Sequence, residues 1–150
     1  MDKKQALSKA MTLCSQREYN EAEIRSKLKT WGAEAVDIEE IMEELISQNF
    51  INDLRFAVAY ARDKVRLNHW GKIKVRYMLS MARVSHAIID QALNEIDDEV
   101  YLDVLGDLLK KKARELKNES DASLKRQKLV RFALGRGFEM ELIINVANSL

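Results

Sequence analysis

Eight basic residues in the middle of the chain are the side chains best suited to chemistry with a partner. They are Arg55, Arg62, Lys64, Arg66, Lys72, Lys74, Arg76 and Arg83. Only two acids, Asp53 and Asp63, accompany them between positions 53 and 86, so the segment carries a local charge of +6 in a chain whose net charge is +1. Guanidinium and ammonium groups bind carboxylates and phosphates, and arginine does so in bidentate geometry. The segment therefore predicts a polyanionic partner or a partner with an acidic surface.

The other reactive residue types lack the spacing of a catalytic or metal site. His69 and His86 have no second ligand at metal-binding spacing, and Cys14 has no neighbouring cysteine or histidine. The glutamates between positions 39 and 44 are typical of the wet face of a helix. A glycine-rich phosphate loop and a nucleophile elbow are also missing from the sequence. The sequence thus favours a protein that is not an enzyme and that uses no cofactor or metal.

Composition indicates which elements must position the basic residues. The 150 residues contain no proline and only five glycines, which favours helices over turn-rich β structure. Hydrophobic residues make up 47% of the chain and charged residues 33%, an ordinary mixture for a domain with a core. The single cysteine, the absence of a signal-peptide pattern after Met1 and the absence of a long apolar run predict a cytoplasmic location and no membrane span.

Three copies of one pattern follow each other along the chain without gaps. Residues 23–45 align with residues 74–96 at a shift of 51, and these align with residues 128–150 at a further shift of 54. Apolar residues coincide in seven columns: Ile24/Val75/Leu129, Leu28/Leu79/Ala133, Ala33/Val84/Phe138, Ile38/Ile89/Ile143, Ile41/Ala92/Val146, Met42/Leu93/Ala147 and Leu45/Ile96/Leu150. Their spacing is typical of helices that bury one face. The pattern predicts an internal threefold repeat.

Each copy is preceded by one more helical stretch, at residues 5–16, 53–67 and 99–116. The repeating unit is therefore three helices, and the units span residues 1–51, 52–97 and 98–150. Because tandem units of this size contact mostly their neighbours, they form a quasi-linear stack. We expect an all-α fold, an elongated and curved array of three tandem three-helix repeats.

Local signals mark the ends of the predicted helices. Asn20 with Glu23 three residues later is a variant of the capping box. Further cap candidates are Asn52 or Asp53 for the fourth helix, Ser85 for the sixth, and Ser120 or Asp121 for the eighth. These residues predict where the second, fourth, sixth and eighth helices begin.

The residue that follows the second helix of each unit is not the same in all three units. Gly32 and Gly137 follow the second helix of their units and suit a left-handed residue there. Arg83 holds the equivalent place in the middle unit, where that conformation costs a non-glycine residue about 1 kcal/mol. We therefore expect the fifth helix to end in a different way.

The predicted helices place the basic residues in two stripes. Arg55, Arg62 and Arg66 share one face of the fourth helix, and Lys72 and Arg76 share one face of the fifth. The turn at residues 68–70 separates the stripes, which therefore can merge into one basic patch. The alternative is a solubilising face that pairs with acids of neighbouring units, for which the candidates are Asp37, Glu40 and Glu44. The repeat position of Trp70, which matches Tyr19 and Leu124, favours packing over base stacking.

Three short runs within this repeat resemble a known family. They are DLRFAVAYARDK from Asp53, GKIKVRYML from Gly71 and RFALGRGF from Arg131. They are similar to the RecX family of bacterial regulatory proteins, across nearly the whole chain and most strongly from position 53 to 79. The sequence departs from the family pattern at Arg83 and Glu139, where a glycine and a serine-type cap are expected.

The resemblance implies a function that the residues alone do not specify. RecX proteins bind the RecA recombinase filament on single-stranded DNA and inhibit its ATPase and strand exchange, by lying in the filament groove or by blocking its extension. The resemblance thus implies a non-enzymatic, monomeric regulator. The basic patch would meet either DNA phosphates or an acidic surface of RecA. Two other functions are open: a helical-repeat regulator that binds nucleic acid directly, and a generic protein-binding scaffold.

Overall fold

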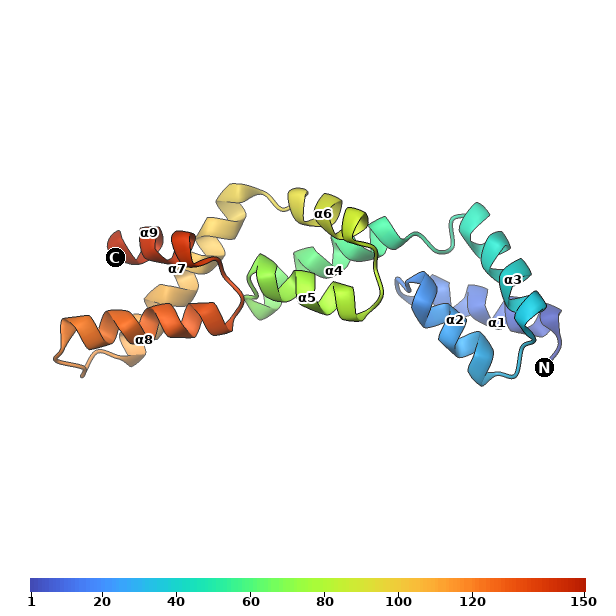
Figure 1. Cartoon of the computed structure of the whole chain (residues 1–150), viewed down its shortest axis with the longest axis horizontal. Helices are drawn as coiled ribbons and strands as arrows, with labels where there is room; N and C mark the ends of the chain where they lie inside the picture. The colour runs from blue at the N-terminus through green and yellow to red at the C-terminus, as the bar shows by residue number, and fades with distance from the viewer.

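The computed structural model describes residues 1–150 and contains nine α-helices and no strand. The helices are α1 (Lys3–Gln16), α2 (Glu21–Thr30), α3 (Ala35–Ser47), α4 (Asp53–Asn68), α5 (Lys72–Met81), α6 (His86–Asn94), α7 (Asp98–Glu115), α8 (Ala122–Gly135) and α9 (Met140–Asn148). They form three successive three-helix units in an elongated row, with the two termini at opposite ends (Figure 1). The predicted all-α, elongated repeat is confirmed.

Side-chain caps start four of these helices where the sequence predicted. Asn20 and Glu23 form both hydrogen bonds of a capping box at the start of α2. Asn52 caps α4, Ser85 caps α6 and Asp121 caps α8. Each of these side chains accepts a hydrogen bond from a backbone N–H group that has no partner inside the helix.

The end of α5 corrects one prediction. Arg83 adopts a left-handed conformation with φ of 66°, like Gly32 at 85° and Gly137 at 93°. The N–H of the following Val84 donates to the Leu79 carbonyl at 3.1 Å, and the other two units end with the equivalent bond. The expected different ending was therefore wrong. Val84 is 3% exposed, and its burial together with the satisfied carbonyls outweighs a local cost of about 1 kcal/mol.

The repeat columns form the core of each unit. Ile24, Val75 and Leu129 are all buried, and so are Leu28, Leu79 and Ala133 in the next column. The pattern weakens at the last column, where Leu45 is fully buried but Leu150 is 51% exposed. The same one-sided burial therefore stabilises all three units.

The two joints between units differ in kind. Buried side chains of the second and third units form one continuous core, whereas the first unit has a separate core of its own. At the second joint the N–H of Gly71 donates to the Arg136 carbonyl at 2.8 Å. The N–H of Ile73 donates to the Gly137 carbonyl at 3.0 Å. Backbone contact and a shared core thus join the second and third units into one body.

Polar groups make the joint between the first and second units. The Asn20 amide nitrogen donates to the Ala82 carbonyl at 3.1 Å, and the N–H of Glu21 donates to the Asp53 carboxylate at 2.9 Å. Arg55 pairs with Glu18 of the first unit at 2.5 Å. Because hydrogen bonds and ion pairs hold this joint without a shared apolar core, it is the weaker of the two.

Candidate interaction surface of the middle unit

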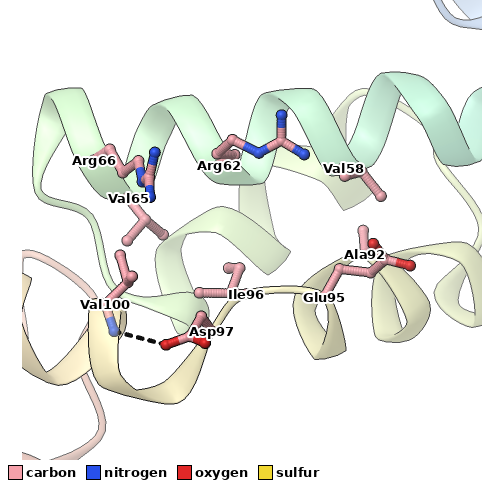
Figure 2. A pocket seen from close by; sticks show the side chains of 9 residues that line it. All are labelled: Val58, Arg62, Val65, Arg66, Ala92, Glu95, Ile96, Asp97 and Val100. Carbon is pink, nitrogen blue, oxygen red and sulfur yellow. Dashed lines mark hydrogen bonds between the residues drawn. The ribbon is translucent and has the colours of Figure 1, made fainter.

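A narrow groove beside α4 holds two of the predicted arginines. Arg62 and Arg66 lie on one wall, above an apolar floor that includes Val58 and Val65 (Figure 2). The opposite wall comes from the end of α6 and the start of α7 and carries Glu95, Ile96, Asp97 and Val100. The groove encloses about 140 Å³. It exists because α4 packs against α6 and α7, a contact that the sequence does not reveal.

The charges in the groove do not neutralise each other. Asp97 accepts the Val100 N–H at 3.1 Å and caps α7 (Figure 2). Neither Arg62 nor Arg66 has an ion-pair partner within 4.0 Å, although Glu95 lines the same groove. Two exposed guanidinium groups one helical turn apart are thus free to bind a carboxylate or a phosphate from outside.

Two lysines gather around the aromatic ring of Trp70, and none of these three residues lines the groove. The ammonium nitrogens of Lys64 and Lys74 lie 5.0 and 4.5 Å from the centre of the Trp70 ring. The Trp70 ring itself packs against the core that the second and third units share, as its repeat position predicted. Because ring and cations attract each other, the contact holds the two positive charges at one place on the surface.

The other four basic residues lie in contacts within the protein or at the first joint. Arg55 also donates to the Asn49 and Phe50 carbonyls, so it holds the linker between the first two units. Arg76 pairs with Asp90 of α6 at 2.6 Å in an exposed position. Arg83 lines the shallow cleft between α2 and the end of α5. The eight predicted residues therefore occupy several environments around the middle unit.

Lys72 belongs to the second joint. Its backbone N–H donates to the Tyr101 hydroxyl at 2.9 Å, and its ammonium nitrogen lies 4.8 Å from the Tyr101 ring centre. The same hydroxyl donates to the Glu139 carboxylate. Burial and this hydrogen bond raise the pKa of Tyr101, so the phenol stays protonated and remains a donor. Glu139 thus accepts a bond across the joint and gives α9 no side-chain cap.

Of the acids of the first unit, only Glu18 pairs with a basic residue of the middle unit. Glu40, one of the acids considered for this role, pairs with Lys3 of its own unit. Six of the eight basic residues have no ion-pair partner, and the two that do pair with Glu18 and Asp90. Much of the positive charge is therefore available to a partner.

Other residue types give few candidate sites. No group of three or more His, Cys, Asp or Glu side chains lies close enough to hold a metal ion. Cys14 packs against the core of the first unit, where burial raises the pKa of its thiol. Among the nine helices, none combines the length and the apolar character that crossing a membrane requires.

One apolar feature of the same unit was not predicted from the sequence. Ile73, Tyr77 and Met81 project from α5 with most of their surface exposed. The aligned repeats contain a signal for this apolar feature, because outward-facing positions can be compared among the three units in the same way as buried positions.

Fold and surface together define a class: an elongated helical-repeat protein with a cationic middle unit. Each unit matches a different domain model of one family. Residues 6–45 match "RecX, first three-helix domain", residues 52–93 match the second three-helix domain, and residues 99–146 match the third. The chain belongs to the RecX family.

Named relatives support the same assignment. The chain is 33% identical over 149 residues to the regulatory protein RecX of Prosthecochloris aestuarii, covering 99% of this chain and 95% of the relative. The chain is 34% identical over 131 residues to the regulatory protein RecX of Clostridium tetani. The matched region covers 87% of this chain but only 60% of that longer relative. A crystal structure of RecX from Lactobacillus salivarius shares the fold, with a TM-score of 0.92 at 22% identity over 99% of this chain and 96% of that one.

Proposed function

We propose that this protein binds RecA recombinase filaments on single-stranded DNA and inhibits RecA's ATPase and strand exchange, with no enzymatic activity of its own. The match of all three units to the RecX family carries this proposal. The protein acts as a monomer in the cytoplasm and either lies in the filament groove or blocks filament extension. An elongated row of units suits a long groove on a helical polymer.

The basic side chains of the middle unit make the contact with the filament. Arg62 and Arg66 are its centre, because their guanidinium groups are exposed and unpaired. Lys64 and Lys74 add two charges around Trp70. Such a surface binds DNA phosphates or carboxylates of RecA, and phosphate contacts give the stronger dependence on salt.

The proposal is tested by titrating the protein into preformed RecA filaments and measuring ATP hydrolysis. The wild-type protein should lower the rate at substoichiometric amounts. The double variant Arg62→Glu/Arg66→Glu should raise the half-inhibiting concentration by at least about tenfold, since it reverses two free charges. Both positions are exposed, so the variant should keep its helical circular dichroism.

Helix α7 offers a matched control. Lys110 and Arg114 are exposed, one helical turn apart and within the last two turns of their helix, as Arg62 and Arg66 are. The variant Lys110→Glu/Arg114→Glu therefore has the same net charge and the same helix-end effect. It should inhibit within about twofold of wild type. Equal losses in both variants would mean that net charge alone, without the groove, governs binding.

Two results would refute the proposed function. A wild-type protein that leaves the ATPase unchanged at equimolar amounts is not an inhibitor of this filament. Sequence-selective binding to duplex DNA above physiological salt, without RecA, would indicate the direct nucleic-acid regulator instead.

A further inference from the structure

The outer face of α5 carries a stripe of exposed apolar side chains. Ile73, Tyr77 and Met81 follow each other at four-residue spacing and are 55%, 61% and 66% exposed. Val75 and Leu79 lie on the opposite face of the helix and are fully buried. The core therefore does not need the stripe.

The other two units show that this stripe is a feature of the middle unit alone. The repeat alignment places Ala22, Ser26 and Thr30 of α2 at the three positions, and Gln127, Arg131 and Gly135 of α8. These residues are small or polar, as expected on a solvent-exposed face. The fold of a three-helix unit thus tolerates polar residues at all three positions, and their apolar character in α5 calls for a partner.

Charge around the stripe specifies the partner's chemistry. Between Lys64 and Ile89 the sequence contains six bases and no acid. On the α5 helix Lys74 lies on one side of the stripe and Arg76, which pairs with the exposed Asp90, lies on the other, by the angular spacing of its residues. A complementary surface has apolar side chains at its centre and carboxylates or phosphates around them.

Side-chain type favours a protein over a nucleic acid. Single-stranded nucleic acids bind to series of aromatic rings on which successive bases stack. Here two of the three exposed side chains, Ile73 and Met81, are aliphatic. Aliphatic and tyrosine side chains with a basic border fit a protein patch of apolar residues ringed by Asp and Glu.

We propose that the outer face of α5 is a docking surface for an acidic, partly apolar protein surface. This inference rests on the proposed function, under which that surface belongs to RecA protomers of the filament. The α5 stripe then supplies the apolar contact, and Lys74 at its border supplies positive charge.

The test removes the apolar character without removing helix propensity. The triple variant Ile73→Gln/Tyr77→Gln/Met81→Gln uses a good helix former that unit three itself carries at the first position. The matched control is Val36→Gln/Leu102→Gln/Leu124→Gln, which changes three exposed apolar residues on other helices. If circular dichroism shows lost helix in the triple variant, Ile73→Lys/Met81→Lys replaces it.

Two measurements are made on each protein: inhibition of the RecA filament ATPase, and fluorescence anisotropy with a labelled oligo-dT in the absence of RecA. The triple variant should need at least about tenfold more protein for half-inhibition, while its oligo-dT affinity stays within about twofold of wild type. The control should match wild type in both.

Each other outcome overturns the inference in a distinguishable way. If wild type inhibits and the triple variant inhibits equally well, the α5 stripe is not a docking surface and the proposed function stands. If the triple variant loses inhibition and oligo-dT affinity together, the occupant is nucleic acid. If wild type does not inhibit at all, the proposed function fails and RecA is not the occupant.

Discussion

The close backbone contact at Gly71 gives the sharpest test of the second joint. A Cβ atom on Gly71 would lie 2.3 Å from the carbonyl carbon and oxygen of Gly137 and from the nitrogen of Phe138. These neighbours are backbone atoms of the third unit, so no side-chain rotation can relieve the overlap. Gly71→Ala must push the second and third units apart.

The magnitude follows from what that separation breaks. Overpacking a core costs about 1 to 3 kcal/mol even where side chains can adjust. Here two backbone hydrogen bonds and the bond from the Lys72 N–H to Tyr101 also cross the joint, at 2.8 to 3.0 Å. Each such bond contributes about 1 kcal/mol. We expect Gly71→Ala to lower the free energy of unfolding by at least about 3 kcal/mol.

Alanine substitutions at two other glycines distinguish the effect of steric overlap on stability from the effect of backbone conformation. Gly106 lies inside α7, and the Cβ of an alanine there would have no neighbour within 4 Å, so Gly106→Ala should raise stability by up to about 1 kcal/mol. Gly32 also has open space but a φ of 85°, so Gly32→Ala should cost about 1 kcal/mol. The predicted order of stability is therefore Gly106→Ala, wild type, Gly32→Ala and Gly71→Ala.

Urea unfolding followed by tryptophan fluorescence measures the stability of the two units that meet at this joint. In a Trp31→Phe background, Trp70 is the only tryptophan, and it packs against the shared core beside the joint. Its fluorescence therefore reports the second and third units. A Gly71→Ala stability within about 0.5 kcal/mol of wild type, or equal to that of Gly32→Ala, would refute the close backbone approach.

Two further predictions concern the end of α5 and the first joint. Arg83→Gly should raise the free energy of unfolding by about 0.5 to 1 kcal/mol in the same urea assay, because it removes the strain of a left-handed arginine; a loss of stability would contradict this. Burial and the neighbouring Asp53 raise the pKa of Glu21, so this carboxyl favours the folded state below about pH 4.5 and loses that contribution as the pH rises through its folded pKa. Glu21→Gln should therefore stabilise the protein relative to wild type increasingly from pH 4 to pH 7, and a difference that does not change with pH would exclude the effect.

Periodic features of the sequence were sufficient to predict the fold. The columns headed by Ile24 and Leu28 predicted buried faces in all three units, because each unit buries the same face of the equivalent helix. Caps such as Asn20 and Ser85 were predictable because their bonds are local. Arg83 was not, because its conformation depends on the burial of Val84 in the tertiary structure.

The candidate site was only partly predictable for the same reason. The sequence indicated that Arg62 and Arg66 share a face, since that depends on one helix. Their groove with Glu95 requires the packing of α4 on α6 and α7, which adjacent residues do not encode. The roles of Arg55 and Lys72 at the joints, and the bond between Tyr101 and Glu139, likewise arise from residues that are distant in the chain.

The separate core of the first unit has a consequence for synthesis on the ribosome. Every buried residue of that core lies between Ala6 and Ile51, so the unit can acquire its full packing while the remaining hundred or so residues are still being translated. The core of the middle unit, by contrast, includes Phe138 and Ile143. Helices α4 to α6 therefore complete their packing only after the residues up to Ile143 have left the exit tunnel, and until then part of their apolar surface stays accessible to chaperones.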